Sequence, residues 1–211
     1  MISLFWIHFS SYWLFSGFFY KYDKQFIDKS INNKNKYYKA IKVSLLNQIF
    51  ITLPIFYLLQ NYINNAIIRS QNDTLIIIFI KLLFMLNISN LLFYISHRIL
   101  HIKNIFKYIH SKHHEFINPV APASLYAHPI EHIICNNLIF LLPYIYFGFP
   151  LITTYMIIIF GTLLTTLSHV EYKFKYLDID HIYHHKYYKY NFGFGGGYID
   201  KLFNTYFIIN E

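Results

Sequence analysis

The chain has 211 residues, of which 55% are hydrophobic, 21% are aromatic and only 13% are charged. Soluble domains carry about 25% charged residues, so this composition excludes an ordinary soluble domain and indicates a membrane protein. The net charge of +8 comes mostly from lysine, but no helix-turn-helix, zinc-finger or RNA-binding signature accompanies it, so we expect no nucleic-acid partner. The single cysteine, Cys135, excludes an intramolecular disulfide and cysteine-rich metal sites.

Five apolar runs follow one another along the chain, and their lengths are typical of membrane spans and hairpin arms. They cover residues 4–20, 43–60, 75–95, 133–147 and 151–168. The first run lacks the basic start and small-residue cleavage site of a removable signal peptide, so we expect a retained anchor. His8 stands alone in that run, and we interpret it as a packing or hydrogen-bonded residue rather than a ligand.

The lysines are distributed unevenly between the polar segments that separate these runs. Seven lysines lie in residues 21–42, whereas residues 61–74 carry only Arg69 and Asp73 as charged residues. The positive-inside rule places the lysine-rich segment in the cytoplasm and brings the segments after runs three and five to the same side. The sequence therefore predicts an all-α, multi-span integral membrane helical bundle, residues 1–211 as one domain, with a cytoplasmic histidine-rich helical cap.

Histidine is concentrated in three short stretches of this predicted cap. The stretches are "HRILH" at 97–101, "HSKHH" at 110–114 and "HIYHH" at 181–185, and the last two share the spacing His-x-x-His-His. Positions i, i+3 and i+4 share one face of a helix, so we expect the three histidines of each repeated stretch to project together, although the adjacent pair diverges somewhat. The pair in the first stretch, at i and i+4, has the spacing that allows both histidines to bind one metal ion.

Eight imidazoles exceed the coordination sphere of a single ion, so two metal ions are the economical interpretation. Imidazole suits Zn, Cu, Fe and Ni, and the spacing alone does not select among them. Neutral histidines would leave Fe(II) electron-poor and open to dioxygen, whereas zinc is redox-inert and cannot oxidise a C–H bond.

Residues 94–206 resemble the fatty acid hydroxylase superfamily, the sterol desaturase group of membrane di-iron enzymes. The three histidine stretches occur in the order of that family. "LYAHPIE" at 125–131 is similar to the family's segment after the second stretch, and "NFG" at 191–193 and "IDKLFNT" at 199–205 are similar to its closing motifs.

The resemblance implies a lipid hydroxylase of the monooxygenase type, with two iron ions as cofactor and molecular oxygen as co-substrate. It implies a sterol, sphingoid or fatty acyl lipid as substrate, a separate electron-donor protein of the b-type cytochrome or reductase class, and location in the endoplasmic reticulum or an equivalent membrane. Glu131 would orient a ligand imidazole or act as a solvated helix-end carboxylate. The implied ligands are His97, His101, His110, His113, His114, His128, His169, His181, His184 and His185.

Several positions depart from the family pattern. Ile182 stands where most relatives carry Asp, Val170–Glu171 replaces the usual Ser-Gly, Ile199 replaces a Trp and Asn204 replaces a Gly. These departures put the substrate and the efficiency in doubt more than the metal binding. Three alternatives remain open at this point: a desaturase or methylsterol oxidase with the same site, a metal-binding membrane protein without redox activity, such as a transporter, and a family member that has lost turnover.

Overall fold

The computed structural model describes residues 2–170, 181–194 and 197–207, and within these ranges the chain forms helices and turns without a strand. The first half contains α1 (Ile2–Ile27), α2 (Ile31–Asn47), the π-helical turn η1 (Gln48–Thr52), α3 (Leu53–Leu58), α4 (Gln60–Arg69) and α5 (Leu75–Leu100). The second half contains α6 (Lys103–Tyr108), η2 (His110–Glu115), η3 (Ala121–Leu125), α7 (Pro129–Ile133), η4 (Ile134–Leu138), α8 (Ile139–Phe147), α9 (Leu151–Leu167), α10 (His181–Tyr187) and α11 (Tyr198–Leu202). The predicted all-α architecture is confirmed.

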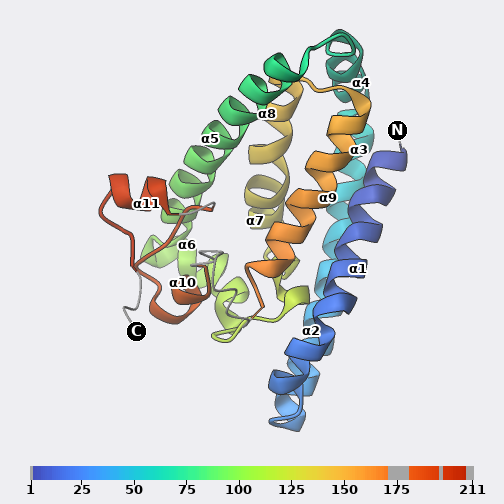
Figure 1. The fold of residues 1–211 in the computed structure, drawn as a ribbon. Helices are drawn as coiled ribbons and strands as arrows, with labels where there is room; N and C mark the ends of the chain where they lie inside the picture. The colour runs from blue at the N-terminus through green and yellow to red at the C-terminus, as the bar shows by residue number, and fades with distance from the viewer. Residues whose placement is uncertain (1, 171–180, 195–196, 208–211) are drawn as a thin grey trace.

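The long helices run side by side between two ends of the molecule (Figure 1). At one end the α4–α5 and α8–α9 turns meet, and at the other α1 turns into α2. Helix α1 lies along α9, where the Thr162 hydroxyl donates to Ser11 Oγ over 3.1 Å. Met85 of α5 and Tyr144 of α8 share a buried apolar cluster, so α8 closes the bundle against α5. Figure 1 places the segments that carry the histidine stretches toward the α1–α2 end.

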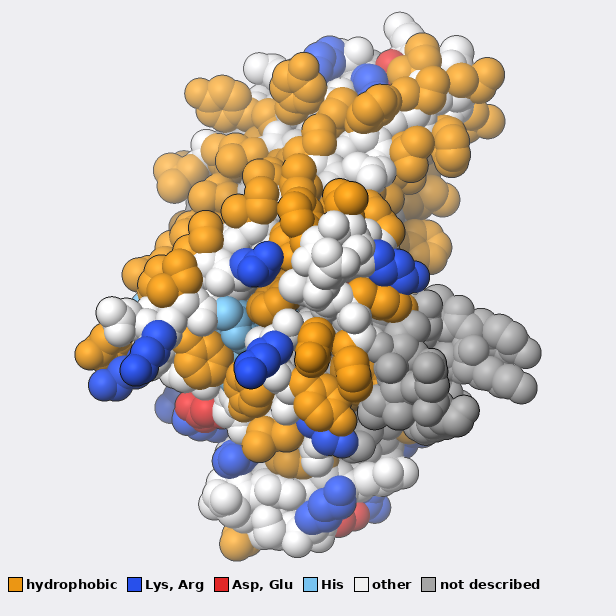
Figure 2. Space-filling view, turned by 90° about the vertical axis from the view of Figure 1, so that its left-hand side faces the viewer, with side chains coloured by type: hydrophobic (Ala, Val, Ile, Leu, Met, Phe, Trp, Pro, Cys, Tyr) orange, Lys and Arg blue, Asp and Glu red, His pale blue; other side chains and the backbone are white. Residues whose placement is uncertain are grey.

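Three helical stretches of the described residues are long and apolar enough to cross a membrane. They are Ile31–Leu58, Leu75–Leu100 and Pro129–Phe147, and Leu151–Leu167 is a shorter apolar helix. The first apolar run lies in α1, which is not among the three. Large apolar side chains of α5 are widely exposed, for example Leu75 at 83% and Phe79 at 67%, and hydrophobic side chains dominate the upper part of the face in Figure 2. Lipid is the solvent that favours such a surface.

Both polar segments between the first three apolar runs are largely helical. Residues 21–27 continue α1, and α2 begins at Ile31 after an N-cap in which Ser30 Oγ accepts from the Asn33 N–H. Residues 60–69 form α4. Lysine and asparagine on the surface of a helix cost little, so a polar composition did not end these helices.

Close contacts stabilise the end of the bundle where the α4–α5 and α8–α9 turns meet. Gly148 has φ +67°, and a Cβ at this position would lie 2.5 Å from the Ala66 carbonyl oxygen. Only glycine therefore allows the α8–α9 turn to approach α4 so closely. Lys81 reaches Asp73 Oδ2 at 2.6 Å, which gives the one charged residue of the third apolar run an anionic partner.

Candidate metal centre

Nine histidines gather into two buried groups at the histidine end of the bundle. Within each group the available imidazole nitrogens lie within 4.8 Å of one another. The five-histidine group contains His97, His101, His110, His114 and His184, and the four-histidine group contains His113, His169, His181 and His185.

Each repeated histidine stretch contributes to both groups, which corrects the expectation that its three histidines project together. His110 and His114, at i and i+4, belong to the five-histidine group, whereas His113 belongs to the four-histidine group. In the second stretch His181 and His185 stay together, and His184 joins the five-histidine group. Adjacent helical residues diverge by about 100°, so the two neighbouring histidines face different centres while the i, i+4 pair shares one.

Backbone carbonyls fix the tautomer of most of these histidines. The Nδ1 atoms of His97 and His184 lie 2.8 Å and 2.7 Å from the carbonyl oxygens of Phe192 and Tyr190. Three histidines of the four-histidine group make the same contact through Nδ1. The carbonyl oxygens are those of Tyr126 at 3.1 Å from His113, Thr165 at 3.1 Å from His169 and Phe116 at 2.9 Å from His185. A carbonyl oxygen only accepts, so Nδ1 carries the proton and Nε2 presents a bare lone pair.

The bare Nε2 atoms face one another at the spacing of ligands on a shared ion. In the four-histidine group, Nε2 of His113 and His169 are 3.3 Å apart, although both rings have their proton on Nδ1. In the five-histidine group, Nε2 of His184 lies 3.1 Å from Nε2 of both His101 and His114. Two nitrogens bound to one ion at about 2.0–2.1 Å lie roughly 2.9–3.4 Å apart for octahedral to tetrahedral angles. Facing lone pairs repel unless a cation lies between them, so the residues present fit a metal in each group.

Burial keeps the imidazoles neutral, which is the form that binds metal. Removal from water lowers the pKa of His101 and of His113 to about 4, and that of His169 to about 3. The same cause, reinforced by neighbouring histidines, holds the pKa of His184 and of His185 well below the usual range. Nε2 of His185 is buried with no hydrogen-bond partner among the described residues, as a metal-facing nitrogen would be.

The two groups are next to each other. The ring centroids of His114 and His185, which belong to different groups, are 4.8 Å apart. Those of His181 and His184 are 5.2 Å apart, and those of His110 and His113 are 5.5 Å apart. The two groups therefore form one continuous cluster of imidazoles.

The closing segment of the chain builds one wall of the five-histidine group. Asp200 accepts hydrogen bonds from the backbone N–H groups of Phe192 and Gly193 at 2.8 Å and 2.9 Å, and from the Thr205 hydroxyl at 2.8 Å. These bonds set the Phe192 carbonyl that receives the proton of His97 Nδ1. Asp200 therefore acts on a histidine through the backbone, a role that its position in "IDKLFNT" did not indicate.

Two departures from the family pattern are accommodated by local structure. Asn204 has φ +55°, and asparagine is one of the few residues that adopt this conformation readily, so it can stand in place of glycine. Ile199 is buried with Tyr94 and Phe192, where a large apolar side chain is needed. The glycine-rich stretch "GFGGG" covers residues 193–197. A Cβ on Gly193 would approach Asn90 and Asp200 to 3.0 Å, which explains the glycine at this position. Glu171, Asp180 and glycines 195–196 lie outside the described residues.

His128 is the one predicted ligand that lies in neither group. It caps the N-terminus of α7, where its Nδ1 accepts from the Ile130 N–H at 3.3 Å. Neighbouring Glu131 points into the centre instead, with Oε1 2.9 Å from His110 Nδ1. His132 pairs its Nε2 with the Thr52 hydroxyl at 2.9 Å and also stays out of both groups.

Comparisons with known proteins agree with the geometry. The fatty acid hydroxylase family model matches residues 82–205. Human fatty acid hydroxylase domain-containing protein 2 is 34% identical over 172 residues, which are 79% of this chain and 51% of that protein. Fatty acid hydroxylase ahd1 of Mycosarcoma maydis is 39% identical over 54% of this chain and 30% of its own length. Methylsterol monooxygenase 1 of Gallus gallus is 33% identical over 47% of this chain and 34% of its own length.

The chain spans about half the length of the fatty acid hydroxylase domain-containing relatives that it matches. No solved structure matches it significantly. Because the family's sequence model covers more than half of the chain and includes every histidine of the two groups, the resemblance inferred from the histidine stretches is confirmed, and the chain belongs to the fatty acid hydroxylase family.

Proposed function

We propose that the chain is a membrane di-iron lipid hydroxylase of the monooxygenase type. The observation that carries this proposal is the division of nine histidines into two adjoining groups with bare Nε2 atoms 3.0–3.3 Å apart. One group alone would suit a single structural ion, whereas two groups in contact suit a pair of metals that act together. Family membership favours iron over zinc for this pair.

The proposed ligands are the nine histidines of the two groups, without His128. Two bound irons would supply the activation of dioxygen, with one oxygen atom entering a lipid C–H bond and the other leaving as water. The protein residues hold and orient: backbone carbonyls keep the protons on Nδ1, and Glu131 orients His110. The rings of Phe106 and Phe192, with centroids 5.3 Å and 5.1 Å from that of His101, pack against the five-histidine group.

The proposed reaction needs two electrons from outside the described residues. The described residues contain no dinucleotide fingerprint or second cofactor site that we recognise. We therefore assign the supply of electrons to a separate b-type cytochrome or reductase. The proposed substrate is a sterol, sphingoid or fatty acyl lipid. Apolar helices that are long enough to cross a bilayer support this choice.

We further propose that the centre faces the cytoplasm, in the endoplasmic reticulum or an equivalent membrane. Lys39 of the lysine-rich segment contacts Glu115 of η2 at 2.7 Å, so the basic residues and the histidine groups share one end of the molecule. The opposite end, with the α4–α5 turn, carries few cations, and the positive-inside rule then assigns the histidine end to the cytoplasm.

The positions of the histidines argue against a metal transporter. A transporter holds its substrate near mid-depth, between broken spans. Here His97 lies in the last turn of α5, and His169 follows the end of α9. A desaturase would use the same centre, and its product distinguishes it because two hydrogen atoms are lost and no oxygen is gained.

The test compares lipids of cells that express the wild type, His184→Ala or His8→Ala. We expect a lipid with one added oxygen atom in the wild type and in His8→Ala, and none in His184→Ala at equal protein level. Protein purified without oxygen should contain close to two irons per chain. Product formation by His184→Ala at the wild-type rate would contradict the proposal, as would one tightly bound metal in active protein.

A further inference from the structure

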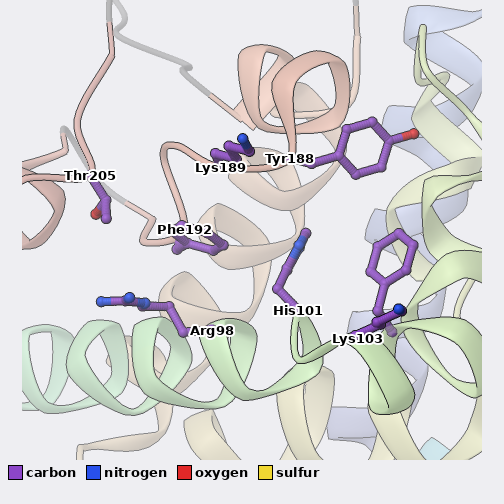
Figure 3. A pocket seen from close by; sticks show the side chains of 8 residues that line it. Arg98, His101, Lys103, Tyr188, Lys189, Phe192 and Thr205 are labelled. Carbon is purple, nitrogen blue, oxygen red and sulfur yellow. The ribbon is translucent and has the colours of Figure 1, made fainter.

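An open pocket of about 460 Å³ lies beside the five-histidine group, on the face shown in Figure 2. Figure 2 shows a histidine between basic side chains on this face. The pocket is bordered by three basic residues from three elements: Arg98 of α5, Lys103 of α6 and Lys189 after α10. Figure 3 shows His101 between Arg98 and Lys103, with Lys189 across the opening. A pocket of this volume is the size of a small-molecule site.

The three basic side chains have no anionic partner among the residues that the structure describes. No carboxylate lines the pocket, and in the part of the chain that the structure describes none of the three forms an ion pair. Arg98 is nevertheless held in place: its guanidinium donates to the Tyr94 hydroxyl at 3.2 Å and lies 5.8 Å from the centre of the Phe192 ring. A positioned but unpaired guanidinium is suited to a phosphate or carboxylate, which it can bind with two parallel hydrogen bonds.

The pocket lies at the end of a candidate membrane span. Arg98 is in the last turn of α5, the most apolar of the candidate spans. Ile99 and Ile102 beside it are 47% and 55% exposed, so apolar surface ends next to this opening. Arginine and lysine at the end of a span reach the interface, where the anionic groups of lipids lie.

One imidazole separates the pocket from the proposed metal position. His101 lines the pocket, and its Nε2 is 3.1 Å from Nε2 of His184 inside the group. Tyr188 forms another wall, with its ring 4.6 Å from that of His114. Its φ of +62° is uncommon for a bulky residue, and such backbone strain tends to occur where a side chain must be placed for function.

We propose that this pocket binds the anionic headgroup, a phosphate or a carboxylate, of the lipid that the centre oxidises. The inference rests on the proposed function, because it takes the five-histidine group as the reacting centre. It adds the class of substrate: an anionic lipid whose oxidised carbon lies within a few bonds of its headgroup, since the pocket and the centre share His101.

The experiment measures binding rather than turnover. Full-length protein in phosphatidylcholine nanodiscs is titrated with three amphiphiles of equal chain length: a fatty acid, an alkyl phosphate and a fatty alcohol. We expect the two anions to bind at least about tenfold more tightly than the alcohol, which corresponds to about 1.4 kcal/mol. The double variant Lys103→Gln/Lys189→Gln and the single variant Arg98→Gln should abolish this preference and leave alcohol binding unchanged. Lys107→Gln, an exposed lysine on α6 outside the pocket lining, is the matched control and should keep the preference.

Competition with inorganic phosphate separates the two sources of an anion. Inorganic phosphate should displace the anionic amphiphiles only weakly if the pocket binds a lipid headgroup. Displacement at equal concentration would mean a site for free anions and would overturn the proposal.

Equal binding of all three amphiphiles to the wild type would also overturn it. So would variants that keep the preference but slow reduction by an acidic redox protein, which would make the pocket a docking surface. Iron content, measured on the same samples, separates this proposal from the first. Two irons without a headgroup preference overturn this inference and leave the hydroxylase proposal intact. A preference without iron contradicts the hydroxylase proposal, and with it the assignment of the bound anion as a substrate, while the anion site itself stands.

Discussion

The five-histidine and four-histidine groups adjoin each other but have different surroundings. The five-histidine group contacts a carboxylate, Glu131, and borders an open pocket through His101. In the four-histidine group, three of the four rings donate to backbone carbonyls, and no member lines that pocket. A pair of metals in these positions would therefore be inequivalent. The position that borders the pocket is suited to meet substrate, and the position away from it is suited to hold its ion.

The largest expected effect comes from removing one histidine from each group, because the two groups contain different numbers of ligands. His185→Ala leaves three imidazoles in the four-histidine group, so we expect iron to fall from about two to about one per chain. Product should fall more than 100-fold, because loss of outer partners alone costs about 10- to 100-fold. His101→Ala leaves four imidazoles in its group and should retain nearly two irons while product falls.

Elemental analysis of protein purified without oxygen, together with lipid mass spectrometry, measures both effects. His8→Ala is the control, since His8 lies in α1 outside both groups. Loss of iron from His101→Ala but not from His185→Ala would reverse the assigned difference between the groups.

Glu131 is expected to influence only the five-histidine group. Glu131→Gln keeps the size of the side chain but removes the acidic group that faces His110 Nδ1. We expect activity or iron affinity to fall about 10- to 100-fold, with the loss confined to one of the two irons. Glu115→Gln is the matched control, because that carboxylate contacts Lys39 and the Tyr126 hydroxyl at the surface. Equal effects of the two variants would contradict an orienting role for Glu131.

The sequence predicted the membership of the centre better than its division. Nine of the ten proposed ligands come together, because i, i+4 spacing brings pairs such as His97 and His101 to one face. The assignment of His113 and His184 to opposite groups depends on how η2 and α10 are docked, which local spacing does not encode. His128 precedes Pro129, and this position is a signal for a helix N-cap that favours a capping role.

The fold was predictable where apolar runs are long and less so where composition is polar. The third run forms one helix, α5, as expected, and the all-helical architecture follows from such runs. The composition of residues 21–42 and 61–74 predicts polar connections, but much of each is helical because packing on neighbours, not composition, decides. The role of Asp200 could not be read from its motif, since it acts through backbone groups of residues 192 and 193.

Acid should destabilise the metal-free protein if the histidines of both groups are buried. Burial lowers the pKa of His101 to about 4, that of His113 to about 4 and that of His169 to about 3, from 6.5. The unfolded chain therefore binds more protons, and stability of the metal-free protein should fall as the pH drops from 6.5 toward 4. Thermal unfolding at several pH values measures this loss. A melting temperature that is constant over this range would mean that the histidines are not buried in the metal-free protein.

The smallest expected effect tests the link between the closing segment and the five-histidine group. Asn204 has φ +55°, so Asn204→Ala should destabilise the protein by about 1 kcal/mol, whereas Asn204→Gly should be nearly neutral. Thr205 next to it donates to Asp200, which positions the Phe192 carbonyl against His97, so a strained turn would loosen that ligand. We therefore expect Asn204→Ala to weaken iron binding in the five-histidine position by a few-fold and to leave the four-histidine position unchanged. Chelator titration of the two irons, alongside thermal unfolding, measures both quantities. Equal weakening of the two positions would mean that the closing segment supports the whole centre rather than one side of it.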